Sequence, residues 1–291
     1  MTKLLKAWRA SPQADVGNRD RPAEIDQPAV LVSKVSKQFR TPDGGELLAL
    51  DGLDFTVAKH EFLSIVGPSG CGKTTMLRIL AGLDVQSRGS VLVEGIAAGS
   101  GPAGFVFQKP ALLPWRTVRR NVSFGVDLAA ARKADSGLQD LQERRRRVAD
   151  LLELVELTDF ADYYPHQISG GMQQRVNLAR ALAIEPPVLL MDEPFSALDA
   201  QTREKLQRDL LNVLASVGTT TVFITHDIRE AVFLADKVIL LSPRPGRILE
   251  TYEVGEPRPR SVEFQQSDDV TEMSRTIWHR LHSDETEEVL R

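Results

Sequence analysis

A glycine-rich stretch, Gly67-Pro-Ser-Gly-Cys-Gly-Lys-Thr74, has the residue types and spacing of a polyphosphate-binding loop. Glycines let backbone N–H groups turn inward around phosphate oxygens without a Cβ clash. An apolar run, Phe62–Val66, precedes the loop and a helical pattern follows it, so a helix N-terminus would face the same anion. Lys73 would contact the β- and γ-phosphates, and the Thr74 hydroxyl would contact Mg²⁺. A chance match is the alternative, and phosphate binding alone does not separate a kinase or a GTPase from other classes.

Two adjacent carboxylates, Asp192 and Glu193, follow the apolar run at residues 188–191. A buried strand would bring its last carboxylate to the carboxyl edge of a parallel sheet, beside the phosphate loop. We therefore assign Asp192 to Mg²⁺ and Glu193 to the base that polarises the attacking water. The alternative is that this acidic pair with Pro194 only starts a helix, because such residues favour first turns.

The elements that must position these groups are visible as short apolar runs separated by helical periodicity. Buried strands are predicted at residues 62–66, 105–107, 188–191 and 220–224, and a helix is predicted over residues 74–83. Alternation at residues 53–57 predicts a half-buried strand, and a change of composition at about residues 118–164 predicts a helical insertion. Strands that alternate with helices favour an α/β fold whose mostly parallel sheet is covered by helices.

Composition narrows the possible classes. The chain has 291 residues, 42% of them hydrophobic, which suffices for one large domain or two small ones. A net charge of −4 gives no global basic field for nucleic acid. The longest strictly apolar run, residues 231–235, is far below the roughly 18 residues of a spanning helix. The N-terminus lacks the apolar core of a secretory signal. A single cysteine, Cys71, excludes an internal disulfide and fits a reducing cytoplasm.

Both ends of the chain are predicted to lie outside the main domain, which we place at residues 29–254. Residues 1–28 are polar, contain three prolines and are expected to form a flexible tail, with a small docking element at Trp8 as the alternative. Residues 255–291 are expected to form a C-terminal tail. Apolar residues at helical spacing around Ile277 and Trp278 make a docking helix possible there.

Five further segments stand in a fixed order around the phosphate loop and the acidic pair. They are Phe39, Gln108, Ile168-Ser-Gly-Gly-Met-Gln-Gln-Arg175, Ser196-Ala-Leu-Asp199 and His226. In that order they resemble the adenine-stacking aromatic, the Q-loop, the signature motif, the D-loop and the switch histidine of the ABC ATPases. The resemblance covers about residues 30–248. It departs from the commonest signature in two places, where Met172 replaces Gln and Ile168 replaces Leu.

The resemblance implies a P-loop NTPase fold with an ABC cassette, a β subdomain and a helical subdomain at about residues 108–170. It also implies a head-to-tail homodimer, in which each ATP lies between one copy's phosphate loop and the other copy's signature segment. Ser169-Gly170-Gly171 is predicted to open a helix, which suits a second anion site. For Ser169 the alternative is a simple N-cap, for His226 a structural histidine, and for Phe39 an ordinary core aromatic.

Carried over residue by residue, the resemblance implies three groups of site residues. The catalytic group is Glu193, His226 and Gln108, and the Mg²⁺ group is Thr74, Gln108 and Asp192. The ATP-binding group is Phe39, Gly67, Pro68, Ser69, Gly70, Cys71, Gly72, Lys73, Thr74, Thr75, Ser169, Gly170, Gly171 and Asp199. Because Cys71 precedes a helix N-terminus, we also expect its thiol pKa to be lowered and its alkylation to block ATP binding.

Four stretches look like those of importers for nitrate, sulfonate, taurine and related solutes, at residues 112–117, 121–125, 191–199 and 242–247. This implies an ATPase peripheral to the cytoplasmic face of the cell membrane. Its partners would be transmembrane permease subunits and, indirectly, a periplasmic or extracellular solute-binding protein, with no nucleic acid. Residues 108–120 would receive a permease helix, with ordinary core as the alternative. The competing function is a non-transport ABC ATPase of the DNA-repair or translation type, which a single cassette without long heptads disfavours.

Overall fold

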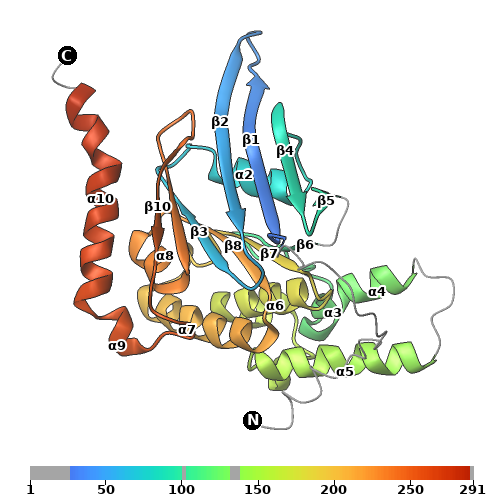
Figure 1. Cartoon of the computed structure of the whole chain (residues 1–291). Coiled ribbons are helices and arrows are strands. Elements are labelled where there is room, and N and C mark those ends of the chain that lie inside the picture. Colours follow the sequence, from blue (N-terminus) through green and yellow to red (C-terminus); the bar gives the residue numbers. More distant parts are fainter. Residues whose placement is uncertain (1–26, 100–102, 132–137, 289–291) are drawn as a thin grey trace, which may run out of the picture.

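The computed structural model describes residues 27–99, 103–131 and 138–288. The predicted N-terminal tail, including Trp8, therefore lies outside the described residues apart from Gln27 and Pro28. Two sheets form the centre of the molecule, one four-stranded and antiparallel and one six-stranded (Figure 1). The mostly parallel sheet and the separate β subdomain were both predicted.

The six-stranded sheet has the order β10-β9-β3-β8-β7-β6, and its neighbours are parallel except for β10 and β9. Its strands are β3 (Phe62–Val66), β6 (Ala103–Val106), β7 (Val188–Asp192), β8 (Thr220–Thr225), β9 (Lys237–Leu241) and β10 (Ile248–Glu253). The central strands are buried along their length because other elements cover both faces of the sheet. Along β3, Phe62 and Val66 enter one hydrophobic core, and Leu63 and Ile65 enter the other.

The antiparallel sheet contains β1 (Val30–Arg40), β2 (Glu46–Val57), β4 (Arg88–Val93) and β5 (Ile96–Ala97). It stands above one face of the six-stranded sheet (Figure 1). Helix α2 (Lys73–Leu80) belongs to the core between the two sheets, where Met76 and Leu77 are fully buried. This helix begins one residue before the predicted helix at residues 74–83 and ends three residues before it, with Ala81 as its C-cap.

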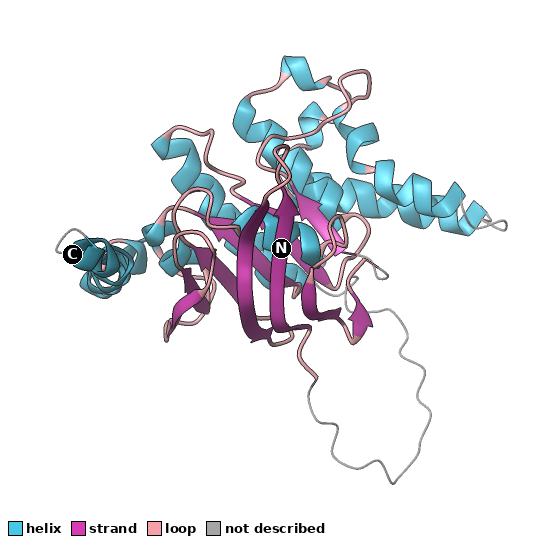
Figure 2. Cartoon of the chain, turned by 90° about the horizontal axis from the view of Figure 1, so that it is seen from above, coloured by secondary structure: helices cyan, strands magenta, loops and turns pink. Residues whose placement is uncertain are grey.

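Helices cover the other face of the six-stranded sheet (Figure 2). They are α6 (Gly170–Leu182), α7 (Ala200–Val217) and α8 (Ile228–Leu234). Residues 118–167 add α3 (Val118–Val122), α4 (Phe124–Ala131), α5 (Leu138–Leu154) and two short 3₁₀ turns, η1 (Thr158–Phe160) and η2 (Pro165–Gln167). Because these helices project to one side, they form a lobe beside the sheet (Figures 1 and 2).

After residue 255 the chain forms α9 (Val262–Gln265) and α10 (Asp268–Glu288). Helix α10 packs on α8, at the opposite side of the molecule from the helical lobe (Figure 1). Val270 and Ile277 on α10 are buried in the same core as α8, whereas Trp278 is 50% exposed. Within the described ranges, none of the helices combines the length and the apolar character that crossing a bilayer requires.

Candidate nucleotide site

The glycine-rich loop connects the end of β3 to the start of α2. Gly70 and Gly72 have φ values of 79° and 104°, which glycine adopts without strain. A Cβ on Gly72 would lie 2.5 Å from a methyl group of Leu50, so the loop also needs this position free of a side chain. Lys73 is 6% exposed, and its amine donates to the carbonyls of Gly67 at 2.7 Å and Pro68 at 3.0 Å. The loop thus curls around its own lysine at the N-terminus of α2.

The acidic end of β7 lies beside this loop. The Thr74 hydroxyl donates a hydrogen bond of 3.1 Å to a carboxylate oxygen of Asp192. Burial, and secondarily the neighbouring charge of Glu193, raise the pKa of Asp192 above its ordinary value. The pair presents two hard oxygen ligands at one point, a donor set that suits Mg²⁺.

Glu193 faces His226 across the carboxyl ends of β7 and β8. An oxygen of Glu193 lies 2.9 Å from Nδ1 of the histidine, whose side chain is 57% exposed whereas that of Glu193 is 20% exposed. Glu193 has φ 41° and donates its backbone N–H to Ile224 of β8 at 2.9 Å. A left-handed backbone at a glutamate is uncommon and is held here by the neighbouring strand.

Gln108 joins this edge of the sheet to the helical lobe. Its amide donates to the Ser196 hydroxyl at 3.1 Å, and its backbone carbonyl accepts a hydrogen bond of 2.8 Å from Gln174 of α6. The buried Asn177, one turn further along α6, donates to the carbonyl of Phe107 at 3.0 Å. Neither Gln174 nor Asn177 was predicted to be functional, although their spacing of three residues on one helix face was a usable signal.

Ser169 and Asp199 are N-caps of α6 and α7. The Ser169 hydroxyl accepts from the backbone N–H of Met172 at 3.3 Å, and the Asp199 carboxylate accepts from that of Thr202 at 3.0 Å. Ser169 and Gly170 are exposed, and a Cβ on Gly171 would lie 2.9 Å from Thr202. In the described part of the chain, no hydrogen bond or ion pair joins Ser169 to the glycine-rich loop.

The remaining predicted ATP-binding residues lie in different surroundings. Ser69 is exposed on the loop, and Thr75 is half-buried in the first turn of α2. Phe39 is half-buried on β1, where the Lys37 ammonium lies 4.8 Å from its ring centre. Among the described contacts, none connects the Phe39 ring to the glycine-rich loop.

The expected lowering of the Cys71 thiol pKa is wrong. The side chain is only 1% exposed, and burial raises the pKa of its thiol, although Lys73 acts in the opposite direction. The helix N-terminus alone suggested an activated thiol. Desolvation outweighs the effect of the helix N-terminus because Cys71 packs inside the loop. A Cβ on Gly67 would lie 2.9 Å from its sulfur.

The segment at residues 242–247 packs against the glycine-rich loop through Gly246. Gly246 donates its backbone N–H to Ala49 at 2.9 Å, and its carbonyl accepts from Asp51 at 3.0 Å. A Cβ on Gly246 would lie 2.1 Å from the carbonyl oxygen of Cys71, so only glycine permits this approach. Residues 242–247 carried a family resemblance in the sequence, but this contact was not predicted from it.

A glycine-rich loop before a helix, beside carboxylates at the end of a parallel strand, defines a P-loop nucleotide-binding protein. The sequence profile of the ABC transporter family matches residues 50–196. An uncharacterised ABC transporter ATP-binding protein of Methanocaldococcus jannaschii is 47% identical over 238 residues, which cover 80% of this chain and 86% of that protein. The chain therefore belongs to the ABC transporter family and is an ATP-binding protein and ATPase of that family.

Two relatives are named for the import of a solute. The aliphatic sulfonates import ATP-binding protein of Bacillus cereus is 41% identical over 234 residues, 80% of this chain and 88% of that protein. The nitrate import ATP-binding protein NrtC of Synechococcus elongatus is 45% identical over 236 residues, 79% of this chain but 35% of that protein. A dimeric, post-hydrolysis structure of the ATP-binding cassette MJ0796 with ADP and Pi has a TM-score of 0.66 at 34% identity. The match covers 78% of this chain and 100% of that one.

Proposed function

We propose that this chain is the ATP-hydrolysing subunit of an importer for a small solute such as nitrate, a sulfonate or taurine. The observation that carries the proposal is the convergence of two pairs at one edge of the parallel sheet. Thr74 with Asp192 forms the first pair, and Glu193 with His226 forms the second. Each pair contains a group from the end of β7, so their functional atoms lie beside the phosphate loop.

In this proposal the glycine-rich loop binds the phosphates of ATP through its backbone N–H groups and Lys73. Thr74, Asp192 and Gln108 would hold Mg²⁺, which supplies positive charge to the phosphates. Glu193 accepts a proton from the attacking water. His226 contacts the terminal phosphate and, through its 2.9 Å contact, orients the Glu193 carboxylate.

The second half of the site would come from a second copy of the chain. Ser169 is exposed at the N-terminus of α6, where backbone N–H groups and the helix dipole favour an anion. Since it makes no contact with the described phosphate loop of its own chain, it is free to serve a neighbour. The dimeric MJ0796 cassette supports such an assembly, and Asp199 would lie at the same interface.

A membrane permease is the proposed partner of the helical lobe, which would place the chain at the cytoplasmic face of the membrane. Residues 108–120 form the proposed docking segment. Trp115 is 71% exposed, more than an ordinary core residue would be, and Phe107 beside the segment is 41% exposed. Gln108 belongs to the same segment, and its amide donates to Ser196 near the end of β7. Binding of the permease to this segment would therefore affect the ATP site. The solute class rests on the sulfonate and nitrate relatives.

Two variants test the ATPase site. Glu193→Gln should bind ATP with unchanged affinity and lose roughly a hundredfold or more in kcat, because only the base is removed. Lys73→Ala should instead weaken ATP binding itself. Equilibrium binding of a fluorescent ATP analogue and phosphate release measure the two effects separately. Normal turnover by Glu193→Gln would refute the assignment of the base.

The solute is tested in cells that carry Lys73→Ala at the native locus. Uptake of labelled nitrate, taurine and an alkanesulfonate is compared with that of wild-type cells. Loss of one solute, with normal uptake of the others, would identify the cargo class. Normal uptake of all three would contradict the proposed substrate range.

A further inference from the structure

Helix α8 positions the switch histidine but is too short to be stable alone. It spans seven residues, Ile228–Leu234, and His226 lies just before its N-cap, Asp227. The Asp227 carboxylate accepts from the backbone N–H of Glu230 at 3.1 Å, which satisfies the N-terminal end. Because so short a helix depends on its surroundings, the groups that hold its other end also determine where His226 points.

The C-terminal end of α8 is held by one buried arginine. Nη1 of Arg260 donates to the carbonyls of Val232, Phe233 and Ala235 at 3.0, 2.9 and 2.8 Å. These are last-turn carbonyls, which a helix cannot satisfy by itself. Arg260 is 5% exposed, and burial lowers its pKa to about 10, so it remains charged at neutral pH beside the negative end of the helix.

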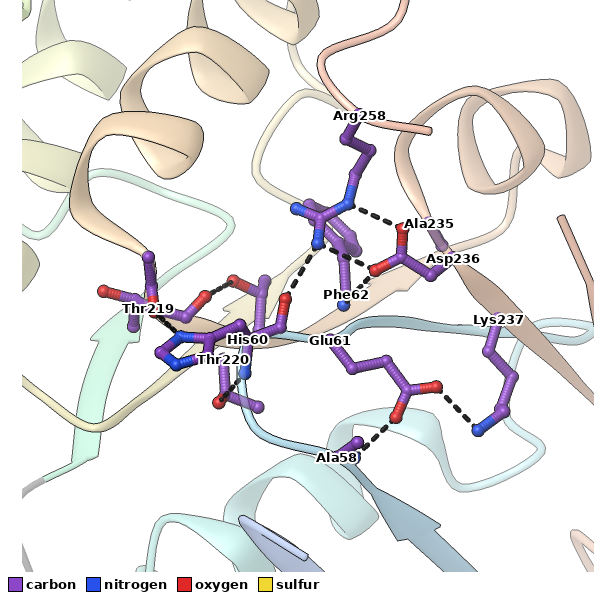
Figure 3. A network of polar contacts seen from close by, with 12 residues as sticks. Ala58, His60, Glu61, Phe62, Thr219, Thr220, Ala235, Asp236, Lys237 and Arg258 are labelled. Carbon is purple, nitrogen blue, oxygen red and sulfur yellow. Dashed lines mark hydrogen bonds and ion pairs between the residues drawn. The ribbon is translucent and has the colours of Figure 1, made fainter. Parts of the chain in front are cut away.

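The segment that carries Arg260 is itself anchored to the sheet (Figure 3). Nε and Nη2 of Arg258 each lie 2.7 Å from a carboxylate oxygen of Asp236, and Nη2 also donates to the carbonyl of His60 at 2.8 Å. Asp236 accepts in turn from the backbone N–H of Phe62, the first residue of β3, at 2.8 Å. Arg258 thus fixes the segment without contacting the α8 carbonyls that Arg260 binds.

We propose that Arg260 is a positioning residue for ATP hydrolysis, which caps the end of α8 and thereby holds His226 beside Glu193. The proposal rests on the proposed role of His226. Seven residues of helix span roughly 10 Å, so the cap lies at one end of α8 and His226 just before the other. Without the cap, three buried carbonyls lose their donor, and the last turn of α8 must rearrange to find others.

The test compares kcat and KM for ATP in purified full-length variants. We expect Arg260→Ala to lower kcat between about tenfold and about a hundredfold with little change in KM, as for a catalytic group misplaced by about 1 Å. Arg260→Lys should retain more of kcat, because an ammonium still donates to carbonyls. Arg258→Gln is the matched control, since it loosens the same segment but leaves the α8 cap in place, and its kcat should stay normal.

A double-mutant cycle separates positioning from a general structural effect. In a His226→Ala background, Arg260→Ala should cause no further loss of kcat. A further loss of the same size, or a normal kcat for Arg260→Ala alone, would overturn the proposal. If Arg260→Ala does not fold, the double-mutant cycle is measured with Arg260→Lys in its place. Normal hydrolysis by Glu193→Gln would instead overturn the proposed site, whatever the Arg260 variants do.

Discussion

The Thr74 hydroxyl donates a hydrogen bond of 3.1 Å to the carboxylate of Asp192, although the two residues are 118 positions apart in the chain. Thr74 lies in the first turn of α2 and Asp192 ends β7. Their contact brings two hard oxygen atoms together beside the phosphate loop. A Mg²⁺ ion bound there requires Asp192 without its proton.

Mg²⁺ binding should therefore weaken as the pH falls. Burial raises the pKa of Asp192, so a proton competes with Mg²⁺ at a higher pH than it would for an ordinary aspartate. We expect the Mg²⁺ affinity of the ADP-bound protein to fall as the pH is lowered, and the fall to begin at a higher pH than for an ordinary aspartate. Calorimetric titration at several pH values measures this. Asp192→Asn is the control, whose weaker affinity should lose most of that pH dependence.

Cys71 should react slowly with alkylating reagents. Its burial and raised thiol pKa leave little exposed thiolate at neutral pH. Mass spectrometry after iodoacetamide treatment should show little modification of the folded protein and complete modification after unfolding in guanidinium. Equal rates in the two states would mean that the loop opens far more often than this packing implies.

The approach of Gly246 to the phosphate loop predicts a steric effect on nucleotide binding. In Gly246→Ala the new methyl group would collide with the Cys71 carbonyl, 2.1 Å away, and the backbone must shift. We expect a loss of roughly 1–3 kcal/mol in the free energy of unfolding, with weaker ATP binding. Gly255→Ala is the control, because its Cβ would meet no atom within 4 Å. Urea denaturation measures the free energy of unfolding of both variants, and titration measures their ATP affinity. If Gly246→Ala and Gly255→Ala gave the same values, the close contact of Gly246 with Cys71 would be contradicted.

Asn177 should stabilise the packing of α6 against the backbone at Phe107 and Gln108. It is fully buried, donates to Phe107 and Gln174, and accepts from Arg180 at 2.9 Å. Asn177→Ala should lower the free energy of unfolding by roughly 1–3 kcal/mol, because the buried partners lose hydrogen bonds. Urea denaturation measures the loss. An unchanged midpoint would show that water or other groups replace the amide.

Much of the fold was predictable because the signals were local. The runs at residues 62–66 and 188–191 are short and almost entirely apolar, as is typical of strands covered on both faces. The glycine spacing likewise predicted the loop between β3 and α2. In parallel strands, residues at the carboxyl ends meet at one edge, so Asp192 was expected beside the phosphate loop, where Thr74 donates to it.

Other features depend on contacts between segments that are distant in the sequence. Gly246 approaches the loop only because residues 242–247 fold back over it, and no local pattern encodes that distance. Cys71 was misjudged for the same reason, since a helix N-terminus is visible in sequence whereas burial is not. Arg260 looked like one charge in a C-terminal tail until the structure placed it at the C-terminal end of α8.

The proposed mechanism depends on Ser169 of one copy facing the phosphates that another copy binds. Glu193→Gln protein with ATP should therefore be a dimer by light scattering, with twice the 32.2 kDa mass of one chain. Adding Ser169→Arg should return it to a monomer. Adding Ser261→Arg, at another exposed N-cap serine, should leave the dimer intact. ATP-dependent dimerisation that survives Ser169→Arg would contradict the head-to-tail arrangement.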